Sequence, residues 1–231
     1  MPGTVAEYQS PISEAMELRE FQASFGMKKR VPPANRKAFD TAVSALKNAR
    51  VPHALVGGLG VISYLPPRYT KDTDFIVLAR DARRAGVALQ KAGFRVLEAF
   101  TPVGNLAGAK VTVFGGPGRV DVIASKSPFF EMALRGARKD STYGVRVAPI
   151  EALIVMKKLA YETRLRSLDG GIQDSGFQDE SDYKRLIATR KWNKTSLGKF
   201  ADLAGVRDAV EADCATFAPA RAGGTGPWTK N

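Results

Sequence analysis

The chain has 231 residues, enough to bury a hydrophobic core in one large domain or two small ones. No apolar run approaches the roughly 20 residues of a membrane span, and the N-terminus lacks the basic and apolar regions of a signal peptide. The single cysteine, Cys214, cannot form an internal disulfide. We therefore expect a cytoplasmic protein without a membrane partner. Lys and Arg number 35 against 23 Asp and Glu, and this net charge of +12 favours a polyanionic partner such as RNA, although a basic surface can also serve solubility alone.

The first part of the chain shows helices and strands in alternation. Residues 1–35 are expected to form an N-terminal arm with a helix over 13–25, which ends because the Pro32-Pro33 pair resists a helix. Apolar periodicity and turn residues then predict a helix over 34–48, a strand over 53–56, a short helix over 59–65, a strand over 73–78, a helix over 81–92 with Asp81 as its N-cap, a strand over 94–100, and a hairpin of strands 110–114 and 119–124 around GGPG.

The pattern becomes helical after Pro149. Helices are expected over 150–166 and 179–191, with a loop at SLDGGIQDSGFQ (167–178) between them, and residues 197–214 are largely helical. We therefore predict an α/β (α+β) fold. A mixed sheet flanked by helices occupies residues 36–148, a helical region follows over 149–214, and a loose tail rich in Ala, Gly and Pro covers 215–231.

A pair of glycines, Gly57 and Gly58, follows the first predicted strand. Glycine lets the backbone approach a phosphate closely, and the start of the helix that follows would present free N–H groups to an anion. The same pair would also serve in a tight strand-to-helix turn that binds no ligand.

Two aspartates, Asp72 and Asp74, enter the next predicted strand two residues apart, so that both point to one face. A pair of acids alone would suit a solvated turn. Here, however, Asp74 precedes FIVL, and a carboxylate beside a buried strand is costly unless it is paired or bound to a metal. Carboxylate oxygens suit Mg²⁺ or Mn²⁺, which such sites share with the phosphates of a substrate.

A third acid, Asp121, alternates with Val120 and Val122 in the second strand of the hairpin. If that strand packs beside the strand of Asp72 and Asp74, three carboxylates converge. Two of them would then hold metal ions while Asp121 takes the proton of an attacking hydroxyl.

Gly-Gly, then Asp-x-Asp about 14 residues on, then a later strand aspartate together resemble the signature of the nucleotidyltransferase superfamily. The segment GGLGVISYLPPRYTKDTDFIV is most similar to its abortive-infection branch of type IV toxin–antitoxin toxins. That branch carries Arg-x-Thr-x-Asp-x-Asp, and later Glu-x-Leu-x-x-x-Lys-x-x-Ala and Asp-x-x-Asp. The matching residues are Arg68, Thr70, Asp72, Asp74, Glu151, Leu153, Lys157, Ala160, Asp179 and Asp182.

The resemblance covers about residues 50–190 and departs from the family at 167–178, where the loop is longer and Gln178 stands in place of a basic residue. It implies an enzyme that transfers a nucleoside monophosphate from an NTP, ATP among them, to the 3′ end of tRNA, and that acts as a toxin with an antitoxin partner.

The site residues that the resemblance implies fall into three groups. They are the catalytic residues and metal ligands Asp72, Asp74 and Asp121, of which Asp121 has a catalytic or structural role, the nucleotide-binding residues Gly57, Gly58, Arg68, Thr70 and Lys157, of which Lys157 is also catalytic, and the supporting residues Asp179 and Asp182. Lys157 lies beside apolar neighbours on its helix and can also extend to solvent, and Lys158 is expected to be the solvated one of the two.

Other functions stay open at this point. The acceptor could instead be an aminoglycoside or a protein hydroxyl, and a relative without catalytic activity could bind RNA. A dinucleotide-binding oxidoreductase fits poorly, since the glycine run that begins at Gly58 ends in Ser63. His53, the only histidine, precedes a strand and is expected to be structural.

Overall fold

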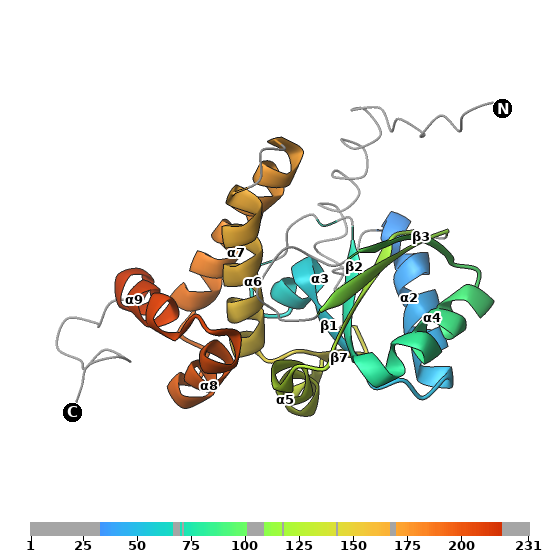
Figure 1. Cartoon of the computed structure of the whole chain (residues 1–231), viewed down its shortest axis with the longest axis horizontal. Coiled ribbons are helices and arrows are strands. Elements are labelled where there is room, and N and C mark those ends of the chain that lie inside the picture. Colours follow the sequence, from blue (N-terminus) through green and yellow to red (C-terminus); the bar gives the residue numbers. More distant parts are fainter. Residues whose placement is uncertain are drawn as a thin grey trace.

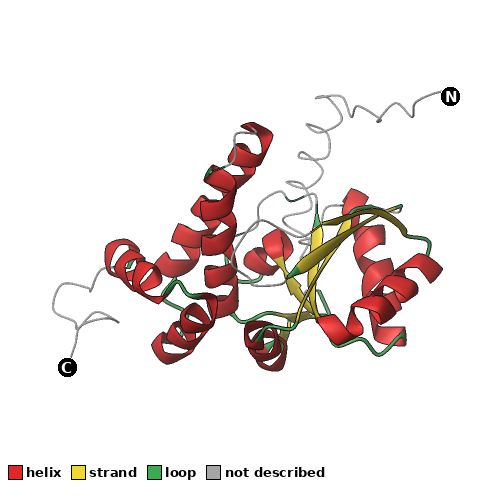
Figure 2. Ribbon diagram, in the orientation of Figure 1, coloured by secondary structure: helices red, strands yellow, loops and turns green. Residues whose placement is uncertain are grey.

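The computed structural model describes residues 33–66, 70, 72–100, 109–116, 118–141, 143–166 and 170–218. These residues form a seven-stranded mixed sheet with the strand order β3-β4-β5-β2-β1-β7-β6. Figures 1 and 2 show this sheet with helices on both sides of it. The strands are β1 (Ala54–Val56), β2 (Thr73–Leu78), β3 (Arg95–Phe100), β4 (Lys110–Gly115), β5 (Val120–Ser125), β6 (Arg138–Lys139) and β7 (Arg146–Val147).

Helices flank this sheet and then continue alone toward the C-terminus. They are α2 (Pro33–Asn48), α3 (Gly57–Ile62), α4 (Ala82–Lys91), which follows a 3₁₀ turn (Ala79–Asp81), α5 (Pro128–Gly136), α6 (Ile150–Leu165), α7 (Gly170–Ala188), α8 (Lys194–Ala204) and α9 (Arg207–Phe217). The predicted α/β fold with a helical C-terminal region is confirmed, and so is the hairpin, whose strands β4 and β5 pair antiparallel.

The two faces of the sheet carry separate hydrophobic cores. Because side chains alternate along a strand, Phe75 and Val77 of β2 face α2 and α4, while Ile76 and Leu78 face α5 to α9. Figure 1 shows α2 and α4 on one side of the sheet and α5 and α6 on the other. By the same alternation, Asp74 points to the α6 side.

The predicted loop is wrong over residues 170–178, because α7 already begins at Gly170, while 167–169 lie outside the described residues. The Gly-Gly pair and the polar residues of this stretch favour a loop, but α7 packs along α6 and completely buries Tyr183, Leu186 and Ile187. Packing of one helix against another outweighs the weak local preference.

Two smaller predictions also change. Asp81 stands at the N-cap position of α4, but its carboxylate accepts a hydrogen bond from Arg84 Nη2 at 2.6 Å and caps no helix N–H. The helical stretch predicted over 197–214 is two helices, which Gly205 separates with a φ of +69°. Helix α5 and the strands β6 and β7 have no counterpart among the predictions.

Some predictions are not tested by these residues. The helix over 13–25 lies outside the described residues, as does the tail beyond residue 218. The boundary at 148/149 stays a prediction, and the core on the α6 side takes residues from both sides of it. Across the described ranges, no helix has both the length and the apolar character that a membrane crossing requires.

Candidate functional site

Two of the three aspartates are direct neighbours in the sheet. Strands β2 and β5 pair in parallel, and the register sets Asp74 beside Asp121. Asp72 precedes β2 by one residue and shares the face of Asp74. The sequence predicted that the three carboxylates converge if these two strands pair, and the strands do pair. We call Asp72, Asp74 and Asp121 the carboxylate cluster.

Gly57 lies against this cluster. Strand β1 runs antiparallel to β2 with Val56 opposite Asp74, so the chain enters α3 beside the Asp74 carboxylate. Gly57 has a φ of +58°, and a Cβ atom there would lie 1.9 Å from Asp74 Oδ2. Only glycine fits both this backbone and this close contact, so the first glycine of the motif makes room for the carboxylate.

The surroundings of Asp74 disfavour its ionised form. Burial, followed by the negative charges of Asp121 and Asp72, raises its pKa to about 7. The positive charges of Lys157 and Arg164 act in the opposite direction. An aspartate that titrates near neutral pH beside two other acids is a feature typical of functional sites.

Arg119 bridges two members of the cluster. Its Nε and Nη2 atoms donate to Asp121 Oδ1 and Oδ2, each at 3.1 Å, and Nε lies 3.5 Å from Asp72 Oδ1. The hydrogen bond to Asp121 is the main reason why the pKa of Arg119 is raised. The guanidinium group of Arg119 therefore contacts carboxylate oxygens of two of the three acids, Asp72 and Asp121.

The donor set of the cluster fits a hard divalent cation, because it consists of carboxylate oxygens alone and crowds negative charge around Asp74. In the side-chain positions observed, no group of three His, Cys, Asp or Glu residues within the described chain could hold a metal ion. Arg119 lies on the oxygens of Asp72 and Asp121 that a shared metal would need.

A second group of charges lies on α6 and α7. Lys157 Nζ contacts Asp179 Oδ1 at 2.5 Å and Asp182 Oδ2 at 3.0 Å, and Arg164 pairs with the other oxygen of Asp179. Lys157 and both aspartates are buried. We call these four residues the buried ion network. Lys157 is therefore held by acids of the chain itself and does not merely extend to solvent.

The remaining predicted site residues differ in how they are placed. Gly58 is buried in α3 and Thr70 is partly buried, while Arg68 lies outside the described residues. His53 is buried and its Nδ1 lies 2.8 Å from Val51 O. Its pKa is lowered, chiefly by burial, which agrees with a structural role.

The prediction that Lys158 is solvated is wrong. Its Nζ lies 2.6 Å from Asp213 Oδ2 and 5.1 Å from the centre of the Tyr161 ring, and its side chain is only 6% exposed. Burial alone would lower its pKa, but hydrogen bonds to Asp213, Tyr161 and Glu162 outweigh burial and raise the pKa. Lys158 joins α6 to α9 and so has a structural role.

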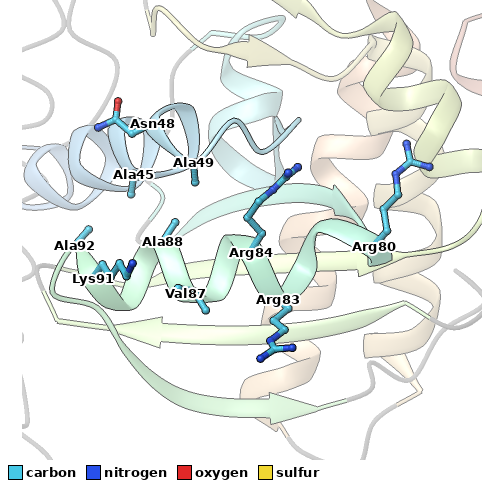
Figure 3. Close-up of a pocket in the computed structure, with 10 residues that line it drawn as sticks. All are labelled: Ala45, Asn48, Ala49, Arg80, Arg83, Arg84, Val87, Ala88, Lys91 and Ala92. Atoms are coloured by element: carbon cyan, nitrogen blue, oxygen red, sulfur yellow. The ribbon is translucent and has the colours of Figure 1, made fainter.

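A basic groove runs between α2 and α4, on the sheet face opposite to the carboxylate cluster. It has a volume of about 780 Å³. Ala45 and Ala49 point from α2 toward Ala88 and Ala92 of α4 (Figure 3). None of the ten lining residues is acidic. Four of them carry positive charge, namely Arg80, Arg83, Arg84 and Lys91.

Comparisons with known proteins give structural neighbours only. No family model matches the sequence, and no curated protein matches it either. A structure of ANT(2'')-Ia in complex with adenylyl-2''-tobramycin aligns at 15% identity over 79% of this chain and 95% of that chain, with a TM-score of 0.49. A putative nucleotidyltransferase from H. pylori aligns at 17% identity over 79% and 80%, with a TM-score of 0.41.

A third neighbour, terminal uridylyl transferase 4 from Trypanosoma brucei with bound GTP, aligns at 14% identity over 78% of this chain and 58% of that chain, with a TM-score of 0.34. These likenesses concern the course of the backbone. What the named proteins bind or modify is a property of those proteins.

Two residues near the cluster were not singled out from the sequence, Arg119 and Arg164. Arg119 stands two residues before Asp121, so the alternation of strand side chains places both on one side. Arg164 lies seven residues after Lys157, two helical turns along the same face of α6. Both spacings are visible in the sequence, and each becomes meaningful only once the partner acid is known.

Proposed function

We propose that this protein is a nucleotidyltransferase that depends on a divalent metal ion and moves a nucleoside monophosphate from an NTP to an acceptor hydroxyl. The observation that carries the proposal is the parallel pairing of β2 and β5, which sets Asp74 beside Asp121 with Asp72 next to them. Three acids kept together at a cost, around an aspartate whose pKa is about 7, are well suited to bind Mg²⁺.

In this proposal Asp72, Asp74 and Asp121 hold the metal, which would stabilise negative charge on the phosphates. The acceptor oxygen forms a bond to the α-phosphorus, the bond from that phosphorus to the β-phosphate oxygen breaks, and pyrophosphate leaves. Asp121 takes the proton of the acceptor hydroxyl. Gly57 and Gly58 bring backbone close to the phosphates, with Arg68, Thr70 and Lys157 as further nucleotide contacts. Asp179 and Asp182 fix the ammonium group of Lys157 at 2.5 and 3.0 Å.

The acceptor that we propose is RNA, at the 3′ end of tRNA. The net charge of +12 and the basic groove both favour a polyanion. The same charge disfavours a polycationic acceptor such as an aminoglycoside. A role as a cytoplasmic toxin controlled by an antitoxin protein rests on the family resemblance of the sequence alone.

Incubation with Mg²⁺, each labelled NTP in turn and total tRNA tests the reaction. We expect transfer of label to RNA with release of one pyrophosphate for each nucleotide. Transfer to an aminoglycoside or to protein with none to RNA would exclude the RNA acceptor and leave the chemistry intact. If the protein binds NTP but transfers no nucleotide to any acceptor and releases no pyrophosphate, it is the RNA-binding relative without catalytic activity.

Reversal of charge in the basic groove tests the route of RNA binding separately. Arg83→Glu with Lys91→Glu should weaken tRNA binding and lower the slope of log affinity against log salt by about 1 for each phosphate that the groove no longer binds. Exposed cations of the other sheet face, changed as Arg185→Glu with Lys199→Glu, provide the matched control of equal charge. Equal losses in both pairs would show that the groove has no special part.

A further inference from the structure

Arg119 uses the oxygens that a metal ion would need. Both oxygens of Asp121 accept from its guanidinium at 3.1 Å, and Asp72 Oδ1 lies 3.5 Å from its Nε. A planar fork on one carboxylate with a second carboxylate beside it is among the stronger ion-pair geometries in proteins. A cation that coordinated Asp72 and Asp121 together would have to replace these contacts.

The backbone and the side chain of Arg119 differ in how firmly they are held. Its carbonyl accepts from Thr73 N at 3.4 Å, which ties the residue to the start of β2. Its side chain, in contrast, is 50% exposed, whereas that of Asp121 is 12% exposed. The guanidinium can therefore leave toward solvent without disturbing the strands, while the acids stay where the sheet register sets them.

The cluster needs positive charge whether or not a metal is bound. Asp74 and Asp121 are neighbours in the register, and Asp72 is close enough to raise the pKa of Asp74. Without a cation, acids this close repel one another and carry an uncompensated cost of burial. Arg119 reduces that cost when no metal ion is present.

We propose that Arg119 is a displaceable counter-ion. It occupies the carboxylate cluster in the metal-free protein and moves off Asp121 when a divalent metal ion binds. This inference rests on the proposed function, because it assumes that the cluster binds metal. Only molecules in which Arg119 has left Asp121 can then bind the metal ion, so the apparent affinity is the intrinsic affinity multiplied by the fraction of such molecules. If Arg119 lies on Asp121 in about nine of ten molecules, the apparent affinity for the metal ion is on the order of tenfold lower than the intrinsic affinity.

Side-chain NMR of the wild-type protein tests the displacement directly. The Nε–Hε signal of Arg119, assigned by its loss in Arg119→Lys, should shift and exchange faster with water as Mg²⁺ is added. Arg146 is the control in the same spectrum, because its guanidinium donates to the carbonyls of Leu134 and Ala137 at 2.8 to 3.1 Å and to no acid of the cluster. An Arg119 signal that stays unchanged while Mg²⁺ saturates the protein would overturn the proposal.

Binding of Mn²⁺ without nucleotide, followed by electron paramagnetic resonance, separates this inference from the proposed function. We expect Arg119→Gln to bind Mn²⁺ about tenfold more tightly than wild type and Asp74→Asn to bind it far more weakly. Arg36→Gln, which removes an equal charge paired with Asp40, should change the affinity little.

The outcomes are distinct. If wild type binds Mn²⁺ through Asp74 but Arg119→Gln binds it no more tightly, the counter-ion role fails and the metal site stands. If neither wild type nor Arg119→Gln binds Mn²⁺, the metal site itself fails, and the displacement fails with it.

Discussion

The two charged regions of this protein are built on opposite principles. The carboxylate cluster sets three acids together with Arg119 on two of them, and Asp74 is left with a pKa of about 7. The buried ion network sets Lys157 and Arg164 against Asp179 and Asp182, so its charges balance. Counted over the described residues, the first region carries more negative than positive charge and is suited to a cation from outside, whereas the charges of the second balance one another. In the function that we propose, the first region therefore binds the metal, and the second places the Lys157 ammonium group for the nucleotide.

The largest effect is expected at Asp74. Asp74→Asn removes a charge but keeps the size of the side chain, so nucleotidyl transfer should fall by about 10³-fold or more, equivalent to about 4 kcal/mol of lost transition-state stabilisation. Initial rates with labelled NTP measure the loss.

Asp40→Asn is the matched control, because Asp40 forms an exposed pair with Arg36 on α2. It should leave the rate unchanged. Full activity of Asp74→Asn would show that the excess charge of the cluster serves no catalytic purpose, and the contrast between the two regions would then lose its functional meaning.

The buried ion network should respond in stability. Asp182→Asn leaves Lys157 with one buried acid instead of two, and removal of a partner from a buried charge pair costs about 3–5 kcal/mol. Urea denaturation measures the loss of unfolding free energy.

Glu180→Gln provides the comparison on the same helix. Glu180 pairs with Lys184 at 2.8 Å, but the two side chains are 30% and 44% exposed, so the expected cost is below about 1 kcal/mol. Similar costs for the two variants would mean that the network is not held by its buried charges.

Much of the fold and part of this contrast could be predicted from the sequence. The continuous apolar run FIVL predicted β2 with the bounds observed, the Gly-Gly and Asp-x-Asp spacing led to Asp72 and Asp74, and the later strand led to Asp121. The partners of these acids could not be predicted, because they depend on which strands and helices pack together. Arg119 acquires its role from the β2–β5 register, and Arg164 from the packing of α6 on α7.

The errors follow the same rule. The stretch 167–178 has the composition of a loop, yet it is helical from Gly170, and the helix continues into residues that pack on α6, namely Tyr183, Leu186 and Ile187. Lys158 looked solvated because its partner, Asp213, lies 55 residues away in α9. Local sequence specifies local structure well, and contacts between distant elements decide which charges are paired.

Gly57 tests whether close packing of the backbone is what keeps the cluster in place. Gly57→Ala adds a Cβ atom 1.9 Å from Asp74 Oδ2 at a backbone φ of +58°. We expect a loss of about 2–4 kcal/mol in unfolding free energy, from backbone strain and overpacking together, and a fall in transfer activity.

Gly144→Ala separates the two causes. Gly144 has a similar φ of +64° but no atom within 4 Å of an added Cβ, so it should show only the conformational cost of about 1 kcal/mol. Equal losses at both glycines would mean that contact with Asp74 adds nothing.

The smallest effect expected is the pH dependence that Asp74 confers on stability. Its pKa rises from 3.8 in the unfolded chain to about 7 in the folded protein. Well below pH 3.8 the carboxyl is protonated in both states and costs nothing. As the pH rises toward 7, the unfolded chain ionises first, so the folded state loses stability, and above 7 the penalty stays constant. Because Asp74 is partly exposed, we expect a loss of about 2 kcal/mol in unfolding free energy rather than the full value of the shift.

Urea denaturation in EDTA from pH 4 to 8 should show wild type losing this stability relative to Asp74→Asn, and Mg²⁺ at pH 8 should restore it to wild type alone. A difference between the two proteins that does not change with pH would mean that Asp74 is not strained by its neighbours, and that the carboxylate cluster is as well balanced as the buried ion network.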